Sequence, residues 1–207
     1  MLTRRTFLVT TAALALVLHA ADARADVAGD AGQWISKVAD EAIQNASAKD
    51  LGWSDKLDRF RHLFVAVFDL PEIGRFVLGR YWRSATPDQQ KDFLDLFEQI
   101  SVLTWARRFT DYGGVKIDIQ HAAPDGERGF VVESSIQTSK GQPIAVTWRL
   151  RQPDGGFKIV DIVVEGVSMA ITHRSEYSSA LQSSGGLPGL LDLMRKKVEQ
   201  LKAQPPA

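Results

Sequence analysis

The spacing of hydrophobic residues changes once along the chain, and that change constrains the fold more than any other feature. From Asp26 to Tyr112 apolar residues recur every three to four positions, which is typical of amphipathic helices. From Val115 onward they alternate with polar residues, which indicates strands with one buried face. Helices followed by strands predict an α+β fold in which the helices cover the apolar face of the sheet.

The helical part divides into segments with their own apolar stripes. The first expected helix has an apolar stripe of Trp34, Ile35, Val38, Ala42 and Ile43, and the second, capped by Ser54, has Leu57, Phe60, Phe64, Val67 and Phe68 on its apolar face. Pro71 opens a short third helix that carries Ile73, Phe76 and Val77. The fourth runs from Pro87 to Tyr112, and its apolar residues are Phe93, Leu96, Phe97, Ile100, Leu103 and Phe109. Seven of the ten phenylalanines fall between Phe60 and Phe109. A well-packed core explains any single one. Together they provide more apolar surface than short helices need, which is compatible with a cavity.

The junction between the last two of these helices has a clear local chemistry. Gly79 is placed to end the helix that begins near Pro71, because a residue without Cβ accepts the left-handed conformation. Thr86 and Gln89 form a capping-box pair around Pro87, which predicts a new helix start. The aromatic and basic residues between them fit either a structural anchor or the rim of an apolar pocket; they are Arg80, Tyr81, Trp82 and Arg83.

The second half predicts a four-stranded antiparallel meander. Its strands are expected at residues 115–120, 130–138, 144–150 and 157–165, separated by turn signals such as Pro124-Asp125-Gly126 and Pro153-Asp154-Gly155-Gly156. A curved sheet under helices commonly encloses a pocket. After the sheet, Gly166 permits a kink, with Val167, Met169 and Ile171 packing inward while Ser168, Thr172 and Arg174 project from the turn.

Two helices should follow the sheet. One begins near Ser175 and ends at Ser183, before Gly185-Gly186, and the other runs from Pro188 to Lys202. The basic cluster Arg195-Lys196-Lys197 fits a solvated helix end or a dock for a partner or anionic lipid.

The first 25 residues predict a cleavable export signal. Arg4 and Arg5 precede an apolar run from Phe7 to Leu18, and small residues end at Ala25. That run is too short to span a bilayer as a mature helix. The twin arginines are compatible with twin-arginine export as well as with the general route. The rest is expected to be a single domain over residues 26–202 (helical part 30–112, sheet part 115–166, C-terminal helices 169–202), followed by a flexible tail at 203–207.

Charge and cysteine content exclude several classes of function. Removing residues 1–25 leaves 22 basic against 24 acidic residues, so no concentrated basic field for nucleic acid is expected. Cysteine is absent, which rules out disulfides and thiolate metal sites in this chain.

Signals for catalysis are weak, and no catalytic residue, metal site or cofactor is expected. His62, His121 and His173 have no metal-ligand spacing, and no nucleophile elbow or phosphate loop occurs. Asp161 and Glu165 nominally share one face of a strand and could act as an acid–base pair. Beside the strand end, they fit better as carboxylates that bind backbone amides or neighbouring arginines. An enzyme therefore stays a minor alternative.

Two separated motifs resemble one known family. The segment Leu78-Gly-Arg-Tyr-Trp-Arg-Ser-Ala-Thr-Pro-Asp-Gln, with Glu165-Gly-Val-Ser-Met and Thr172-His-Arg-Ser-Glu, is similar to the MlaC (toluene-tolerance) family of periplasmic lipid-binding proteins associated with ABC transporters. The segments Arg75 to Arg83 and Glu165 to Ala170 resemble its hopanoid-associated, HpnM-like branch at least as closely. The match covers roughly Ile35 to Leu201, and Trp82 is a small departure from the family's usual aromatic pair.

The resemblance implies a cystatin/NTF2-like sheet and a soluble carrier that binds a phospholipid or hopanoid as cargo. Its partners would be an outer-membrane lipoprotein complex and an inner-membrane substrate-binding protein of the transporter, with transient contact to the membrane surface. An assembly factor without lipid is the main alternative. The expected pocket lining is Phe64, Val67, Phe68, Ile73, Phe76, Val77, Phe93, Phe97, Ile100, Phe109, Ile119, Val132, Ile136, Val146, Trp148, Ile162, Val164, Val167 and Met169. The expected rim for the headgroup is Tyr81, Trp82, Arg83, Ser168, Thr172 and Arg174.

Overall fold

The computed structural model describes residues 26–45, 48, 50–110, 116–137, 141–153 and 156–204. Its helices are an N-terminal helix at residues 26–45, α2 (Trp53–Val67), α3 (Leu70–Leu78), α4 (Arg80–Ser84), α5 (Pro87–Thr110), α6 (Met169–Ser183) and α7 (Leu187–Ala203). The predicted export signal at residues 1–25 and the last three residues lie outside the described part. Ala203, expected in the tail, belongs to α7.

The strands form an antiparallel sheet in the order β1-β2-β3-β4-β5. They are β1 (Lys116–Asp125), β2 (Gly129–Gln137), β3 (Ile144–Arg151), β4 (Lys158–Val164) and β5 (Val167–Ser168). The α+β class and the antiparallel meander are confirmed, but the expected count of four strands was one too few. Glu165 and Gly166 both take positive φ, at 48° and 81°, which a two-residue type I′ hairpin turn requires. Val164 can then pair with Val167.

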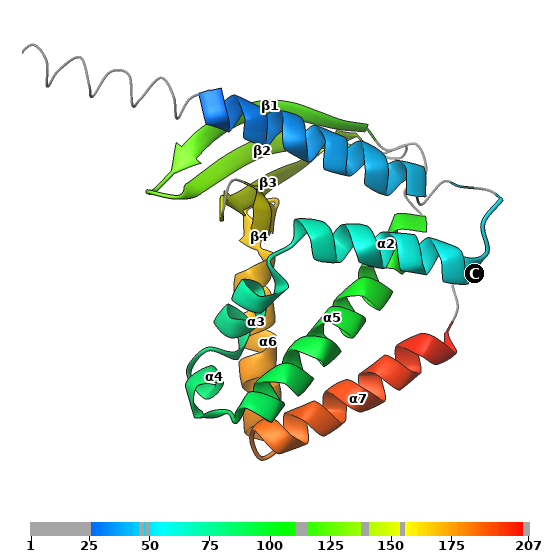
Figure 1. The fold of residues 1–207 in the computed structure, drawn as a ribbon, viewed down its shortest axis with the longest axis vertical. Coiled ribbons are helices and arrows are strands. Elements are labelled where there is room, and N and C mark those ends of the chain that lie inside the picture. The colour runs from blue at the N-terminus through cyan, green and yellow to red at the C-terminus, as the bar shows by residue number, and fades with distance from the viewer. Residues whose placement is uncertain are drawn as a thin grey trace, which may run out of the picture.

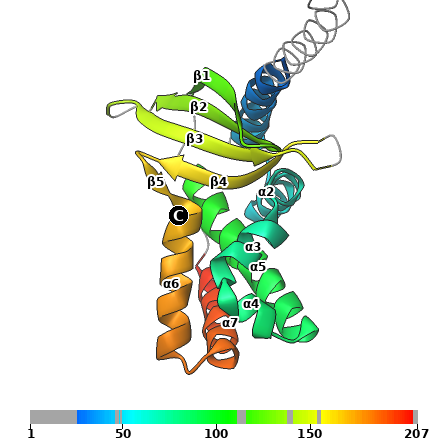
Figure 2. The same ribbon diagram turned by 90° about the vertical axis from the view of Figure 1, so that its left-hand side faces the viewer.

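The sheet and the N-terminal helix occupy one end of the molecule, and most of the remaining helices extend away from them (Figure 1). Turned by 90°, the same arrangement shows α6 and α7 running away from the sheet, with α2 directly beneath it (Figure 2). The described part therefore consists of a sheet layer, a helix on that layer and a helical arm.

The apolar interior is divided between two hydrophobic clusters. The helical cluster joins α2, α3, α5, α6 and α7 and is centred on residues such as Phe93, Leu78 and Leu181. The sheet cluster packs the small residues Ala28 and Ala31 of the N-terminal helix against the sheet and part of α2. Small side chains let this helix approach the strands closely, so the two layers are tightly packed at its beginning.

Strand β4 joins the two layers through its backbone. The chain between α2 and α3 forms an isolated parallel bridge from Phe68 to Ile159, and the Asp69 amide donates to the Ile159 carbonyl at 2.9 Å. The Lys158 ammonium also donates to the Ala66 carbonyl at the end of α2. These bonds fix where α3 begins relative to the sheet.

Helix starts follow the local chemistry at some positions and differ from expectation at others. The capping box before α5 is confirmed: the Gln89 amide donates to the Thr86 hydroxyl at 3.2 Å, and the Thr86 amide donates to the Gln89 side chain at 3.1 Å. Ser54 does not cap α2, because the helix begins one residue earlier, at Trp53, after Gly52. Pro71 lies in the first turn of α3 as expected, and Asp69 caps this helix by accepting from the Glu72 amide.

Replacing Thr86 with alanine should lower the free energy of unfolding by about 1 kcal/mol, because the Gln89 amide loses the Thr86 hydroxyl as its acceptor. Urea denaturation followed by circular dichroism measures the change. The matched control is Ser54→Ala, which removes a hydroxyl from the first turn of α2 without removing a cap and should change stability by less than about 0.5 kcal/mol. Equal losses in both variants would contradict the assignment of the cap.

Candidate functional site

A cavity of about 360 Å³ separates the two hydrophobic clusters. Its walls come from the N-terminal helix, α2, α3, α5, α6 and the inner face of the sheet. The lining consists of Ile35, Val38, Ala39, Ala42, Ile43, Phe60, Leu63, Phe64, Val67, Phe68, Leu70, Ile73, Phe97, Ser101, Trp105, Ile117, Ile136, Ile144, Val146, Trp148, Ile159, Val160, Asp161, Ile162, Val164, Met169, Ala170 and His173. Aliphatic and aromatic side chains dominate this list, so the cavity suits an apolar guest.

Asp161 is the buried carboxylate of the cavity wall, with 8% of its surface exposed. One carboxylate oxygen accepts from the Ser168 hydroxyl at 2.6 Å, and the other accepts from the Ala170 amide at 2.9 Å. The Ser168 hydroxyl in turn accepts from the Ile171 amide at 3.1 Å. The carboxylate therefore pins the beginning of α6 to β4, where the helix N-terminus also favours negative charge.

This network explains why α6 begins at Met169 and not near Ser175 as expected. Ser168 is the N-cap of the helix, so the residues predicted to lie in a turn are in its first turns. The Thr172 hydroxyl donates to the Ser168 carbonyl at 2.8 Å. The expectation that Val167 and Ile171 pack inward is wrong: they are 53% and 59% exposed, Val167 on β5 and Ile171 in the first turn of α6.

A second polar group near the cavity is also satisfied internally. The Trp148 indole donates to the Ser134 hydroxyl at 2.9 Å, and that hydroxyl donates to the Val146 carbonyl at 3.0 Å. This bond holds the Trp148 ring in place on the wall. Buried polar groups that already have partners leave the cavity without a strong demand for a polar ligand.

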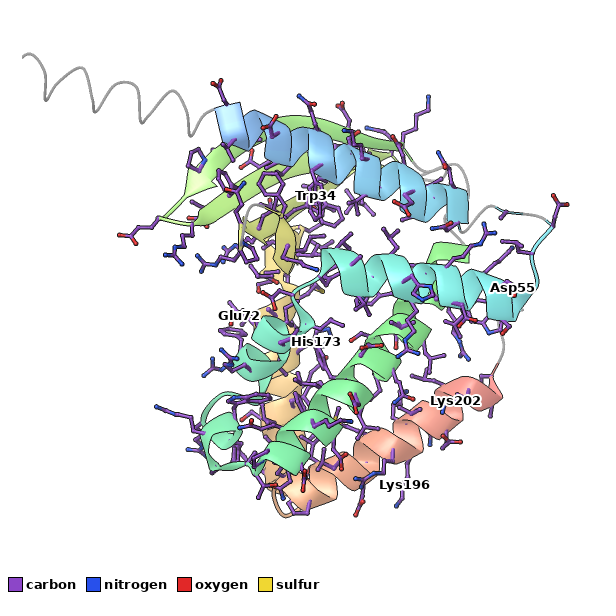
Figure 3. All side chains as sticks on the ribbon, viewed as in Figure 1. Trp34, Asp55, Glu72, His173, Lys196 and Lys202 are labelled. Carbon is purple, nitrogen blue, oxygen red and sulfur yellow. The ribbon has the colours of Figure 1, made fainter. Side chains whose placement is uncertain are left out.

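His173 lines the cavity from α6 (Figure 3), and its Nδ1 lies 3.1 Å from the Glu176 carboxylate. Farther along α6, Tyr177 packs edge-on against Phe93 and Phe97, and burial raises the pKa of its phenol. The phenol therefore stays neutral, and the ring contacts hold α6 against α5.

The structure brings many of the predicted lining residues together around the cavity. Those on its walls are Phe64, Val67, Phe68, Ile73, Phe97, Ile136, Val146, Trp148, Ile162, Val164 and Met169. They come from helices and strands far apart in the sequence, and the cavity lies between sheet and helices as the pattern suggested. Their role toward a ligand stays a prediction.

Other predicted lining residues lie elsewhere. Val77 and Phe93 are buried in the helical cluster, with Ile100 packed against it, and Val132 is buried in the sheet cluster, with Ile119 packed against it. Phe76 points outward with 39% of its surface exposed. The side chain of Phe109 is outside the described residues.

The predicted rim does not form one site beside the cavity. Tyr81 and Trp82 pack against the helical cluster from α4, and Arg83 is exposed on the same helix. Ser168 and Thr172 use their hydroxyls to build the beginning of α6. Arg174 places its guanidinium over the Phe76 ring, with 4.8 Å between the guanidinium carbon and the ring centroid.

The main omission of the prediction is the wall formed by the N-terminal helix. Its stripe of Ile35, Val38, Ala42 and Ile43 was recognised as amphipathic, yet it was not assigned to the pocket. A single helical stripe does not show whether it faces a core or a void. Here its beginning packs on the sheet while its later turns face the cavity. Trp34, which points toward the sheet in Figure 3, contacts Phe157 with 5.8 Å between ring centroids.

The candidate acid–base pair is divided between separate tasks. Asp161 holds α6, whereas the exposed Glu165 accepts from the Ala145 amide on β3. Among the described residues, histidine and carboxylate side chains nowhere gather into a group that could hold a metal ion. A search of the same residues found no helix with the length and apolarity needed to cross a bilayer.

Comparison with known proteins identifies the family. The model of the family described as MlaC protein matches residues 36–196. The chain belongs to the MlaC family. As an MlaC-family chain it is 28% identical over 149 residues to the intermembrane phospholipid transport system binding protein MlaC of Haemophilus influenzae, covering 70% of this chain and 67% of the relative. It is 24% identical over 129 residues to the toluene tolerance protein ttg2D of Pseudomonas putida, and the match covers 62% of this chain and 60% of that relative.

A solved structure supports the fold of this MlaC-family chain. The phospholipid-binding protein of Ralstonia solanacearum, solved in complex with a phospholipid, superposes with a TM-score of 0.71 at 21% identity. The superposition covers 81% of this chain and 96% of that protein. The cavity of the present chain thus lies within an MlaC-type fold.

Asp161→Ala should lower the free energy of unfolding by about 2 kcal/mol, because it leaves the Ser168 hydroxyl and the Ala170 amide without their acceptor. Thermal and urea unfolding measure the loss. Asp118→Ala removes an exposed carboxylate from β1 and should change stability by less than about 0.5 kcal/mol. A small effect at Asp161 would show that α6 does not depend on this anchor.

Proposed function

We propose that this protein is a periplasmic carrier that holds the acyl chains of a phospholipid in the cavity between its two hydrophobic clusters. The main support for the proposal is the cavity, because apolar residues from the N-terminal helix, α2, α3, α5, α6 and the sheet line it. The names of the two relatives, which describe phospholipid transport and phospholipid binding, support the choice of cargo. The predicted export signal supports the periplasmic location.

The physical need for such a carrier follows from the cargo. Two acyl chains hold about 30 methylenes, and exposing each costs about 0.8 kcal/mol, so on the order of 20 kcal/mol opposes their crossing water unaided. A cavity that replaces bilayer contacts with protein contacts removes most of this barrier. Transfer between membrane and protein is then nearly balanced, and no chemical step is needed.

The walls of the cavity set how the cargo fits. The acyl chains would lie against the apolar side chains between the sheet and the helices, with the headgroup left toward solvent.

The carrier is proposed to move lipid between an outer-membrane lipoprotein complex and an inner-membrane transporter component. Extraction and mass analysis of lipid that purifies with the protein tests the cargo class directly. A phospholipid mass is expected, and a hopanoid would correct the class of lipid. A protein consistently free of lipid after gentle purification would favour an assembly factor without cargo.

Filling the cavity should exclude the cargo. Ala39→Trp places an indole at a buried position of the wall, and native mass spectrometry should show at least tenfold lower lipid occupancy. The matched control is Gln33→Trp, which adds the same ring on the exposed side of the same helix and should keep its lipid. Full occupancy in the Ala39 variant, with the fold intact by circular dichroism, would place the lipid elsewhere.

Removing the lipid should destabilise the protein. A ligand that binds only the folded state adds RT ln(1 + [L]/Kd) to stability, so a delipidated sample should melt at a lower temperature than the same protein reloaded with phospholipid. Differential scanning calorimetry on the two samples measures the difference. Identical melting temperatures would mean that the lipid does not occupy the folded interior.

A further inference from the structure

Arginine side chains lie on aromatic rings around the junction of α3, α4 and α6. The Arg75 guanidinium carbon is 5.7 Å from the centroid of the Trp82 ring, and that of Arg80 is 5.0 Å from the Tyr81 ring. Arg174 lies over Phe76 in the same way. We call the surface formed by Arg75, Phe76, Arg80, Tyr81, Trp82 and Arg174 the arginine–aromatic surface.

Gly79 allows this surface to form. It ends α3 with φ at 58°, a conformation that glycine adopts without strain. A Cβ at this position would lie 3.3 Å from a terminal nitrogen of the Arg174 guanidinium, so the absence of a side chain lets Arg174 approach the backbone. The motif that contains Gly79 thus brings arginines from two separate parts of the chain together.

The surface is exposed and predominantly positive. Arg75, Arg80 and Arg174 are all exposed, and Arg83 extends the positive charge along α4. The acidic group that faces them is Glu72, on the outer side of α3 in Figure 3, with 3.7 Å between its carboxylate and the Arg75 guanidinium. Among the described residues no carboxylate forms an ion pair with Arg83 or Arg174.

Large apolar side chains are exposed on the same elements. Phe76 is beneath the Arg174 guanidinium, and Ile171 is one helical turn before Arg174 on α6. Val167 is exposed on β5, directly before this helix. Such side chains gain free energy when they leave water, and arginines beside them bind phosphate oxygens through paired N–H donors.

We propose that the arginine–aromatic surface docks on a bilayer that contains anionic phospholipid, with guanidinium groups at the phosphates and apolar side chains below them. Arginine, tyrosine and tryptophan beside exposed aliphatic residues match the chemistry of the bilayer interface, where amphipathic side chains keep a polar end in water. Attraction to anionic lipid adds to the apolar contribution.

The position of the surface suits a protein that exchanges lipid. The helices that form it, α3 and α6, also supply Ile73, Met169 and Ala170 to the wall of the cavity. Docking there would place that wall beside the membrane. The docking proposal goes beyond the proposed carriage of lipid, and it can fail while the cavity still holds cargo.

Flotation with lipid vesicles tests the proposal. The sample is the protein purified from the bacterium in which it is expressed, after any processing of the export signal. Vesicles of phosphatidylcholine alone are compared with vesicles that also contain phosphatidylglycerol, at low and high salt. The protein should float with the mixed vesicles at low salt and much less at high salt, because salt screens the attraction. The combined variant Arg75→Gln, Arg80→Gln and Arg174→Gln should bind on the order of 100-fold more weakly.

The control removes the same number of charges from α7, in the variant Lys196→Gln, Lys197→Gln and Lys202→Gln. These lysines are exposed away from α3 and α4, and the variant should keep the parent's binding. A separate variant, Ile171→Ser, should weaken binding at least several-fold while leaving the salt dependence unchanged. Circular dichroism confirms that each variant folds.

Several outcomes would overturn the docking proposal. A parent protein that does not float with the mixed vesicles would point to an acidic protein or another occupant of the surface. Equal binding by the parent and the arginine variant, or loss of binding only in the α7 variant, would place the contact elsewhere. Lipid content measured by mass spectrometry on the same samples reports separately on the cavity.

Discussion

The structure depends on an apolar interior that is not closed. Two hydrophobic clusters both include residues of α2, yet a cavity of about 360 Å³ remains between them. Apolar side chains that face such a space lack part of the packing contacts that a filled core would give them. A fold can tolerate such a space when a guest restores the missing contacts, which is the physical basis for a carrier.

Hydrogen bonds hold the helices at the edges of the cavity to the sheet, so the walls stay apart. β4 holds the chain between α2 and α3 through Ile159, and it holds the beginning of α6 through Asp161. Farther along, Tyr177 and its ring contacts hold α6 against α5. The helices are therefore held to the sheet at their ends, and the space between those fixed points accommodates a chain.

Local chemistry made much of the fold predictable from the sequence. The change of period gave the α+β class, and the residues around Gly79 and Thr86 predicted a helix end and a helix start that the structure confirms. The errors came from interactions between distant or competing groups. α6 begins early because Asp161, on a strand, accepts from the Ala170 amide and from the Ser168 hydroxyl that caps the helix. β5 exists because Glu165 adopts a positive φ that few residues of its type adopt. Periodicity identifies an apolar face but not its neighbour, so Phe93 and Val132 were assigned to a pocket when they are core.

A crystal structure of the protein purified without detergent would test the central claim most directly. The account predicts continuous density for a hydrocarbon chain between the sheet and α2, bounded by residues such as Phe64, Val146 and Ala39. Walls in mutual contact, with side chains filling the space and no density for a guest, would contradict it.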